Sequence, residues 1–283
     1  MAIFENGGVP IAYEVAGQGP PLLLLHGFPQ TRALWRPVAA RLSDRFTCVM
    51  PDLRGYGASA KPDPGPDLAP YSFRAMAADQ VALMAHLGFA AFHVAGHDRG
   101  GRAAHRLALD APHAVRTLTV MDIVPTLHLL EHWSAEVSQA YFHWSYLAQP
   151  APFPDRMICA DPDHFYGACL LGWGGARLAD FPELDAYRAA WRDPATIAGM
   201  TNDYRAAVTI DRAHDSADRD RRVECPALVL YGASGAMARL FDVPATWAPR
   251  LADMRAAAIP GGHFFVDQSP DATADALAGF LTV

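Results

Sequence analysis

The chain has 283 residues, of which 51% are hydrophobic and 19% charged, and its formal net charge at pH 7 is -7. This length and apolar fraction are enough to bury a large core, in one domain with a sizeable insertion or in two lobes. The acidic balance argues against a nucleic-acid partner, because an acid interrupts even the most basic run, at residues 219–222.

The sequence carries no signal for export or membrane insertion. Its first residues lack the basic start and apolar stretch of a signal peptide, and no apolar run approaches the roughly 20 residues of a membrane helix. We therefore expect a cytoplasmic protein without membrane contacts. The cysteines lack Cys-x-x-Cys spacing, which predicts buried free thiols rather than disulfides or metal ligands. They are Cys48, Cys159, Cys169 and Cys225.

The first half of the chain predicts alternating strands and helices. Gly7-Gly8 between two extended stretches indicates a hairpin within residues 3–15. Short apolar segments predict buried strands, and amphipathic spacing predicts helices. The strands are expected at 22–25, 46–50, 91–95 and 115–121, and the helices at 35–42, 73–87 and 100–110. Residues 61–70, rich in proline, glycine and aspartate, are expected to form a loop.

Residues 127–215 differ from the rest, because aromatic residues crowd this segment and strand patterns vanish from it. After it, strands are expected at 227–231 and 254–259 and a closing helix at 271–281. Strands that alternate with helices predict an α/β fold with a doubly wound, mostly parallel sheet. The aromatic segment predicts a helical cap over the carboxyl edge of that sheet, where ligands bind in such folds. The expected domains are a core in two parts, 1–126 and 216–283, and a cap, 127–215.

Asp98 occupies the centre of a Gly-x-Asp-x-Gly pattern, between the strand expected at 91–95 and the following helix. Gly96 and Gly100 permit a turn so tight that larger side chains would clash, and such a turn presents the central side chain over the end of the sheet. The pattern is also that of an ordinary turn in which Asp98 caps a helix. Its interpretation therefore depends on other motifs.

Three motifs follow expected strand ends in chain order: His26-Gly27-Phe28-Pro29, Gly96-His97-Asp98-Arg99-Gly100-Gly101 and Gly261-Gly262-His263-Phe264. Together they resemble the α/β-hydrolase superfamily over essentially the whole chain, and the order nucleophile, acid, histidine is that of this fold. His263, just after the last strand, is then the expected general base. The alternative is a turn residue on a Gly-Gly loop.

A carboxylate at the elbow favours displacement at a saturated carbon over attack on an amide carbonyl. The leaving group would be a halide or the oxygen of a strained epoxide, and Asp98 would carry an ester intermediate. His263 would then deprotonate a water that attacks the carboxyl carbon of this ester. The backbone N–H groups of Phe28 and Arg99 are expected to stabilise the tetrahedral oxyanion.

A basic histidine needs a carboxylate that fixes its tautomer. The usual superfamily position, the turn after the strand at 227–231, holds no acid, and Asp242 lies several residues further on. Asp122, at the end of the strand expected at 115–121, is therefore the expected relay acid, unless it only caps a helix or turn. A relay acid at this place occurs in haloalkane and haloacetate dehalogenases, so this position also narrows the resemblance.

Arg99 and Arg102 lie three residues apart in the first turn after the elbow. Cations there oppose the helix dipole at a cost of about 0.3–1 kcal/mol each when exposed, so another interaction is expected to offset it. One interpretation is ion pairs with Asp98 or other acids. The interpretation that we favour is a bidentate clamp for a substrate carboxylate beside the nucleophile. Arg99 stands where neutral-substrate dehalogenases and epoxide hydrolases typically have tryptophan.

The cap segment contains His143-Trp144 and Asp203-Tyr204-Arg205. Imidazole, indole and phenol groups are uncharged donors that stabilise a departing halide, although each of these residues alone is more readily explained by packing or by a surface position. With the arginine pair they resemble the fluoroacetate (haloacetate) dehalogenase family. This resemblance implies that His143, Trp144 and Tyr204 bind the halide. Trp173 is expected either to line the pocket or to belong to the cap core.

The leading hypothesis is hydrolysis of small 2-haloacids, with fluoroacetate or chloroacetate giving glycolate and halide. The expected partner is a small anionic substrate. Neither a cofactor nor a metal is expected, because histidines and acids show no metal-binding spacing. The resemblance also suggests a homodimer.

Two alternatives remain open. An epoxide hydrolase would use the same Asp98, His263 and Asp122, but with two cap tyrosines that donate to the epoxide oxygen. The candidates for those two are Tyr141, Tyr146, Tyr166 and Tyr204. The arginine pair argues against this alternative, because an epoxide carries no anion. A non-catalytic binding protein on the same fold is the third hypothesis, although a binder has no need of all three triad residues.

Overall fold

The computed structural model describes residues 1–173 and 175–281. Within these residues an eight-stranded sheet runs in the spatial order β1-β2-β4-β3-β5-β6-β7-β8. β2 pairs antiparallel with both β1 and β4, whereas the other neighbours pair in parallel. The strands are Ala2–Asn6 (β1), Val9–Ala16 (β2), Pro21–Leu25 (β3), Thr47–Pro51 (β4), Phe92–His97 (β5), Val115–Met121 (β6), Ala227–Gly232 (β7) and Met254–Ile259 (β8).

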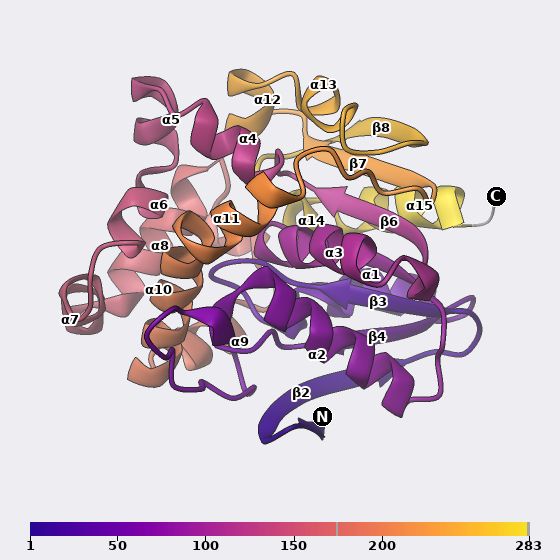
Figure 1. The fold of residues 1–283 in the computed structure, drawn as a ribbon, viewed down its shortest axis with the longest axis horizontal. Helices are drawn as coiled ribbons and strands as arrows, with labels where there is room; N and C mark the ends of the chain where they lie inside the picture. Colours follow the sequence, from indigo (N-terminus) through magenta and orange to yellow (C-terminus); the bar gives the residue numbers. More distant parts are fainter. Residues whose placement is uncertain (174, 282–283) are drawn as a thin grey trace.

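Helices cover both faces of this sheet. α2 packs against α3, and α1 packs against α15. In Figure 1, α2 and α3 lie in front of the sheet and α15 lies behind it. The core helices are Arg36–Leu42 (α1), Phe73–His86 (α2), Arg99–Asp110 (α3), Ala236–Leu240 (α12), Val243–Trp247 (α13), Phe265–Gln268 (α14) and Pro270–Leu281 (α15). Short 3-10 helices occur at Arg32–Trp35, Ala69–Tyr71, Pro112–Ala114 and Leu178–Asp180.

The segment between β6 and β7 is helical, as the sequence predicts, and forms the cap. It gathers at the side of the sheet toward which the parallel strands point, at the left of Figure 1. Its helices are Thr126–Glu131 (α4), Ala135–Ala140 (α5), Phe142–Leu147 (α6), Phe153–Ala160 (α7), Pro162–Gly172 (α8), Leu184–Trp191 (α9), Pro194–Val208 (α10) and Ile210–Ala217 (α11). The domain division at residues 126 and 215 stays a prediction.

The strand register places the ends of three strands at one edge. Leu25 of β3 is aligned with Gly96 of β5, and His97 of β5 is aligned with Met121 of β6. The residues that follow these pairs therefore emerge side by side. One of them is Asp98, whose backbone N–H donates to the carbonyl of Met121 at 3.1 Å.

Most local expectations agree with the fold, but the expected burial of two cysteines does not. The strands expected at 115–121 and 254–259 coincide with β6 and β8. The prediction that all cysteines are buried is wrong for Cys159, which is exposed, and for Cys225, which is half-buried, although all four are free thiols. Cys159 lies on α7, a helix that shows much of its surface to solvent. None of the helices in the described part of the chain is long and apolar enough to cross a membrane.

Candidate active site

A sharp turn between β5 and α3 presents Asp98. This residue has a left-handed backbone angle, φ +48°, a conformation that costs a non-glycine residue about 1–3 kcal/mol. A Cβ atom on Gly96 would lie 2.3 Å from the carbonyl oxygen of Gly100, and a Cβ on Gly100 would lie 2.3 Å from that of Leu25. Both positions therefore require glycine, and the turn holds the Asp98 side chain at the end of the sheet.

Asp98, His263 and Asp122 come together at this edge. His263 Nδ1 lies 2.7 Å from Asp122 Oδ2, and His263 Nε2 lies 3.9 Å from Asp98 Oδ2. Asp122 Oδ1 accepts a hydrogen bond from the backbone N–H of Gly232 at 2.8 Å. Because the Asp122 carboxylate is an acceptor, Nδ1 of His263 carries the proton and Nε2 is the basic nitrogen that faces Asp98. Asp242 is exposed and accepts a hydrogen bond at the start of α13 instead.

The protonation states of these groups follow from burial and neighbouring charges. Burial would raise the pKa of Asp98, but the charges of His263 and Arg99 outweigh it and lower that pKa to about 2. Burial also opposes a charge on His263, yet the hydrogen bond and charge of Asp122, with a contribution from Asp98, raise the pKa of His263 above its ordinary value. Asp98 is therefore an anion near neutral pH, and its charge favours protonated His263.

The loop after β3 approaches Asp98 closely. The backbone N–H of Phe28 donates to Asp98 Oδ1 at 2.9 Å. A Cβ on Gly27 would lie 2.5 Å from the Cβ of Asp98, so this loop also requires glycine. Oδ1 is therefore the oxygen that the predicted oxyanion donor Phe28 holds, and Oδ2 is the oxygen on the side of His263. Arg99, the other predicted donor, is the first residue of α3.

The cap holds the side chain of Arg99, which is fully buried. Arg99 Nε donates to Asp203 Oδ2 at 2.9 Å, and Nη2 donates to Asp203 Oδ1 at 2.5 Å and to the Asp203 carbonyl at 3.2 Å. The guanidinium lies 4.2 Å from the ring centroid of Tyr204. An ion pair with another acid, one of the two interpretations open from the sequence, is thus present at Arg99. This ion pair involves Nε and Nη2 of Arg99, whereas Nη1 takes no part in it.

Arg102 is buried one turn further along α3. Its Nη1 donates to the Val124 carbonyl at 3.0 Å and to the Thr126 hydroxyl at 2.9 Å, so it binds the connection from β6 to the cap. Burial and the neighbouring Arg99 lower the pKa of Arg102 to about 10, which leaves it cationic near neutral pH. In the described residues it forms no ion pair with an acid.

The three predicted halide donors lie together in the cap. The ring centroids of His143 and Trp144, both in α6, are each 5.4 Å from that of Tyr204 in α10. The ring of Phe28 lies 5.2 Å from that of Tyr204, so this group reaches the loop beside Asp98. Burial lowers the pKa of His143 well below the ordinary value of a histidine. Burial also raises the pKa of Tyr204 well above the ordinary value of a tyrosine, so both side chains are neutral donors. Trp173 completes this wall, with its ring 4.1 Å from that of His143.

Buried polar atoms are normally hydrogen-bonded, and those that are not need an explanation, of which a catalytic or binding role is one. Within residues 1–173 and 175–281, several such atoms without a partner belong to this group. They are His263 Nε2, His143 Nδ1, Arg99 Nη1, Arg102 Nε and the hydroxyls of Tyr204 and Tyr141. The candidate site therefore combines a buried carboxylate, two cationic side chains and neutral donor groups, several of which have no hydrogen-bond partner among the described residues.

Sequence reasoning missed Asp203 and Tyr56. Asp203 pairs with Arg99 across 104 positions of the sequence, and the Tyr56 hydroxyl donates to Asp203 Oδ2 at 2.6 Å. One signal was available, because two cations in the first turn of a helix need a compensating acid. Asp203 stands directly before Tyr204, which the sequence did single out. Nothing in the sequence distinguishes it from the other acids of the cap.

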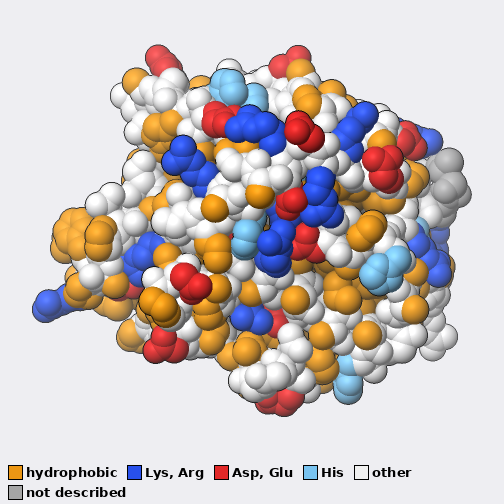
Figure 2. All heavy atoms as spheres, in the orientation of Figure 1, with side chains coloured by type: hydrophobic (Ala, Val, Ile, Leu, Met, Phe, Trp, Pro, Cys, Tyr) orange, Lys and Arg blue, Asp and Glu red, His pale blue; other side chains and the backbone are white. Residues whose placement is uncertain are grey.

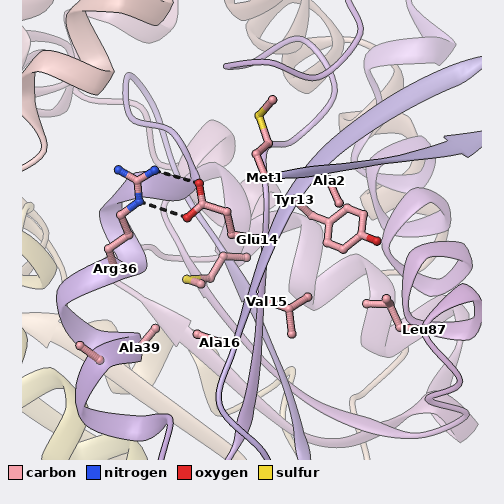
Figure 3. Close-up of a pocket in the computed structure, with 11 residues that line it drawn as sticks. Met1, Ala2, Tyr13, Glu14, Val15, Ala16, Arg36, Ala39 and Leu87 are labelled. Carbon is pink, nitrogen blue, oxygen red and sulfur yellow. Dashed lines mark hydrogen bonds and ion pairs between the residues drawn. The ribbon is translucent and has the colours of Figure 1, made fainter.

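An open groove lies elsewhere, next to β2 and α1 (Figure 3). Tyr13, Val15 and Leu87 line it, and Glu14 accepts hydrogen bonds from Arg36 at one side. The Arg36 hydrogen bond lowers the pKa of Glu14 to about 2, so the pair is fully ionised. As far as the described residues show, no predicted site residue lines this groove. The candidate active site therefore remains at the carboxyl edge of the sheet.

Comparisons with known proteins agree with this assignment of the fold. A family model of the α/β hydrolase fold matches residues 20–270. A putative α/β hydrolase from Nostoc sp has a TM-score of 0.97 and 43% sequence identity, covering 99% of this chain and 97% of that one. A putative epoxide hydrolase from Pseudomonas aeruginosa has a TM-score of 0.92 and 39% sequence identity. This match covers 99% of this chain and 94% of that one.

Two curated relatives differ in how much of the chain they match. Fluoroacetate dehalogenase from Burkholderia sp is 55% identical over 282 residues, 99% of this chain and 93% of that protein. A soluble epoxide hydrolase from a Corynebacterium species is 43% identical over 120 residues, 42% of this chain and 40% of that protein. Of these two curated relatives, the dehalogenase is the more similar and matches nearly the whole chain. The chain belongs to the α/β-hydrolase fold family and, within it, to the haloacetate dehalogenase type.

Proposed function

We propose that this hydrolase of carbon–halide bonds acts on small 2-haloacids, with fluoroacetate or chloroacetate giving glycolate and halide. One observation carries the proposal: Asp98, Arg99 and Arg102 are buried together at the start of α3. A buried carboxylate nucleophile beside two cations suits an anionic substrate, because the cations offset the repulsion between two negative charges. The 55% identity to a fluoroacetate dehalogenase supports the same substrate class.

The first step is displacement at the carbon that carries the halogen. Asp98 Oδ2 attacks this carbon, a carbon–oxygen bond forms, and the carbon–halogen bond breaks as halide leaves with its electron pair. Asp98 is ionised at neutral pH because its pKa is about 2. The burial of the site limits the substrate to a small molecule.

The cap donors act on the leaving group. His143, Trp144 and Tyr204 donate to the halide as its charge develops, so they stabilise the transition state more than the neutral carbon–halogen bond. Fluoride, the smallest and hardest halide, needs this help most. Because His143 and Tyr204 are neutral, they hold the halide less tightly than full charges would, which assists its release.

The second step is hydrolysis of the ester. Esterification removes the negative charge of Asp98, which is one of the influences that raise the pKa of His263. His263 Nε2 then takes a proton from water, and the hydroxide adds to the Asp98 carboxyl carbon. The oxyanion forms on Oδ1, which already accepts the Phe28 N–H, and the Arg99 N–H is the proposed second donor. Collapse breaks the bond between the Asp98 carboxyl carbon and the oxygen of the 2-hydroxyacid, and His263 returns its proton to that oxygen. The regenerated Asp98 carboxyl group then loses its proton to solvent, which restores the carboxylate.

Product analysis tests this function against its alternatives. The purified protein is incubated with fluoroacetate, chloroacetate and styrene oxide, and fluoride, chloride, glycolate and diol are measured. We expect halide and glycolate in equal amounts. Diol without halide would contradict the proposal and favour an epoxide hydrolase, the activity named for a relative that matches 42% of the chain. Absence of every product would favour a non-catalytic binding protein.

We also propose that the protein forms a homodimer through apolar side chains of the cap. Phe153 and Met157 of α7 are 56% and 60% exposed, and Phe142 of α6 is 43% exposed. Figure 2 shows hydrophobic side chains gathered at the left of the molecule, where α7 lies in Figure 1. Contiguous exposed apolar surface often marks an interface. Sedimentation of wild type and Met157→Glu tests this, and a monomeric wild type would contradict it.

A further inference from the structure

The guanidinium of Arg99 has only one nitrogen left for a substrate. Arginine has five N–H groups, and the Nε N–H and both Nη2 N–H groups are directed at Asp203 Oδ2, Asp203 Oδ1 and the Asp203 carbonyl. Nη1 is buried and is without a hydrogen-bond partner among the residues that the structure describes. Asp203 therefore determines which edge of Arg99 faces a ligand.

Asp203 is itself held in place from the core. The Tyr56 hydroxyl donates to Asp203 Oδ2 at 2.6 Å, and both side chains are fully buried. Gly199 lies one turn earlier on α10, and a Cβ there would lie 2.3 Å from the carbonyl oxygen of Gly55. The backbone of α10 thus touches the loop that carries Tyr56. This contact brings Asp203 to Arg99 at the elbow.

Tyr204, the next residue on α10, belongs to the proposed halide site. The ring of Tyr204 lies 4.2 Å under the guanidinium of Arg99, and its buried hydroxyl is one of the proposed halide donors. A shift of α10 would therefore move the support of Arg99 and the Tyr204 donor together. Two successive residues of α10 thus serve the proposed carboxylate site and the proposed halide site.

We propose that Asp203 is a positioning residue for substrate carboxylate binding, which acts by holding Arg99 so that Nη1 faces the substrate. The proposal rests on the proposed function, because it takes a 2-haloacid as the substrate. Arg102 Nε, also buried, is the complementary N–H group. The carboxylate is thus shared between two arginines instead of being held by the fork of one. Tyr56 supports the same arrangement through Asp203.

The test compares Asp203→Asn with Asp155→Asn. Asp155 is the matched control, because it forms an ion pair of 2.6 Å with Arg205 on the same helix but contacts no proposed site residue in the described structure. We measure kcat and KM for chloroacetate and the inhibition constant of acetate. Asp203→Asn is expected to raise KM and the acetate constant together, by roughly tenfold or more, as for loss of a charged hydrogen bond. Asp155→Asn is expected to leave both unchanged.

A purely structural role would give a different result. It would lower kcat through a smaller active fraction and leave KM and the acetate constant at their wild-type values. That result would overturn the proposal, as would a fall in KM, which would mean that Asp203 competes with the substrate for Arg99. If wild type releases no chloride from chloroacetate, the proposed function itself fails, which is a separate outcome.

Tyr56→Phe provides a second variant that keeps both charges. It removes only the hydroxyl that donates to Asp203 and leaves the Arg99–Asp203 ion pair in place, so we expect a smaller rise in KM and in the acetate constant, about two- to fivefold. Circular dichroism checks that each variant folds. If Asp203→Asn does not fold, Tyr56→Phe decides alone, and unchanged constants in it overturn the proposal.

Discussion

The core side and the cap side of the candidate site are built differently. On the core side, Asp98, Asp122 and His263 each follow the end of a strand, and the register of the sheet brings the strand ends to one edge. On the cap side, His143 and Tyr204 come from helices whose mutual placement depends on packing between aromatic rings. In the proposed mechanism, the core side makes the new bond and the cap side binds the leaving group.

This difference determines what each side tolerates. The core groups are fixed by backbone turns, such as the left-handed conformations of Asp98 and Asp122. The cap groups are fixed by side-chain contacts, which respond to substitutions elsewhere in the same helices. Changes on the core side should therefore abolish the reaction, whereas changes on the cap side should alter which substrates are used.

The largest expected effect tests Asp122, the expected relay acid, against Asp242, the next acid after β7. Asp122→Asn removes the acceptor that fixes the tautomer of His263, and we expect chloride release to fall by about 10²- to 10⁴-fold. Asp242→Asn should leave it within twofold, because Asp242 is exposed and only caps α13. Initial rates at saturating chloroacetate check this. A severe loss in Asp242→Asn instead would assign the relay role to Asp242.

A smaller effect is expected on the cap side. Tyr204→Phe deletes one buried donor, and we expect fluoride release to fall by about 10- to 10³-fold, as when one donor to a transition-state anion is removed. The loss should be smaller for chloroacetate and bromoacetate, whose leaving groups need less help. Tyr146→Phe, at a half-buried tyrosine of α6, is the control. Equal losses for all three halides would show that Tyr204 does not contact the leaving group.

The pH dependence should distinguish the two chemical steps. Ester formation needs ionised Asp98, whose pKa is about 2, so its rate should stay constant from about pH 4 upward. Ester hydrolysis needs neutral His263, and protonation of His263 at low pH removes the base. Steady-state turnover should therefore fall by about tenfold for each pH unit below the pKa of His263. Rapid-quench measurement separates the steps, and a parallel fall of both would contradict these roles.

The smallest effect concerns stability and compares two glycines. Gly96→Ala forces a Cβ against the Gly100 carbonyl and should lower the free energy of unfolding by about 1–3 kcal/mol. Gly167→Ala, in cap helix α8 with no atom within 4 Å of the added Cβ, should raise it by about 0.5–1 kcal/mol. Urea unfolding measures both. Destabilisation by Gly167→Ala would show that the cap packs more tightly than its contacts indicate.

More of the core side than of the cap side could be predicted from the sequence. The strand expected at 115–121 is β6, and the motif glycines predicted the turn around Asp98, because these features depend on short segments. The partner of Arg99 was not identified, because Asp203 lies 104 residues away and meets it only through the packing of α10 on the Gly55 loop. Two interpretations of Arg99 were open from the sequence. In the structure its side chain pairs with Asp203, and Nη1 has no hydrogen-bond partner among the residues described.

The central claim is that Asp98 forms an ester that His263 helps to hydrolyse. His263→Asn keeps a side chain of similar shape but removes the base, so the ester should accumulate on incubation with chloroacetate. Intact-protein mass spectrometry should then show one carboxymethyl group per chain, and peptide mapping should place it on Asp98. The wild type should show none at steady state. An unmodified His263→Asn protein that still releases chloride would contradict the covalent mechanism.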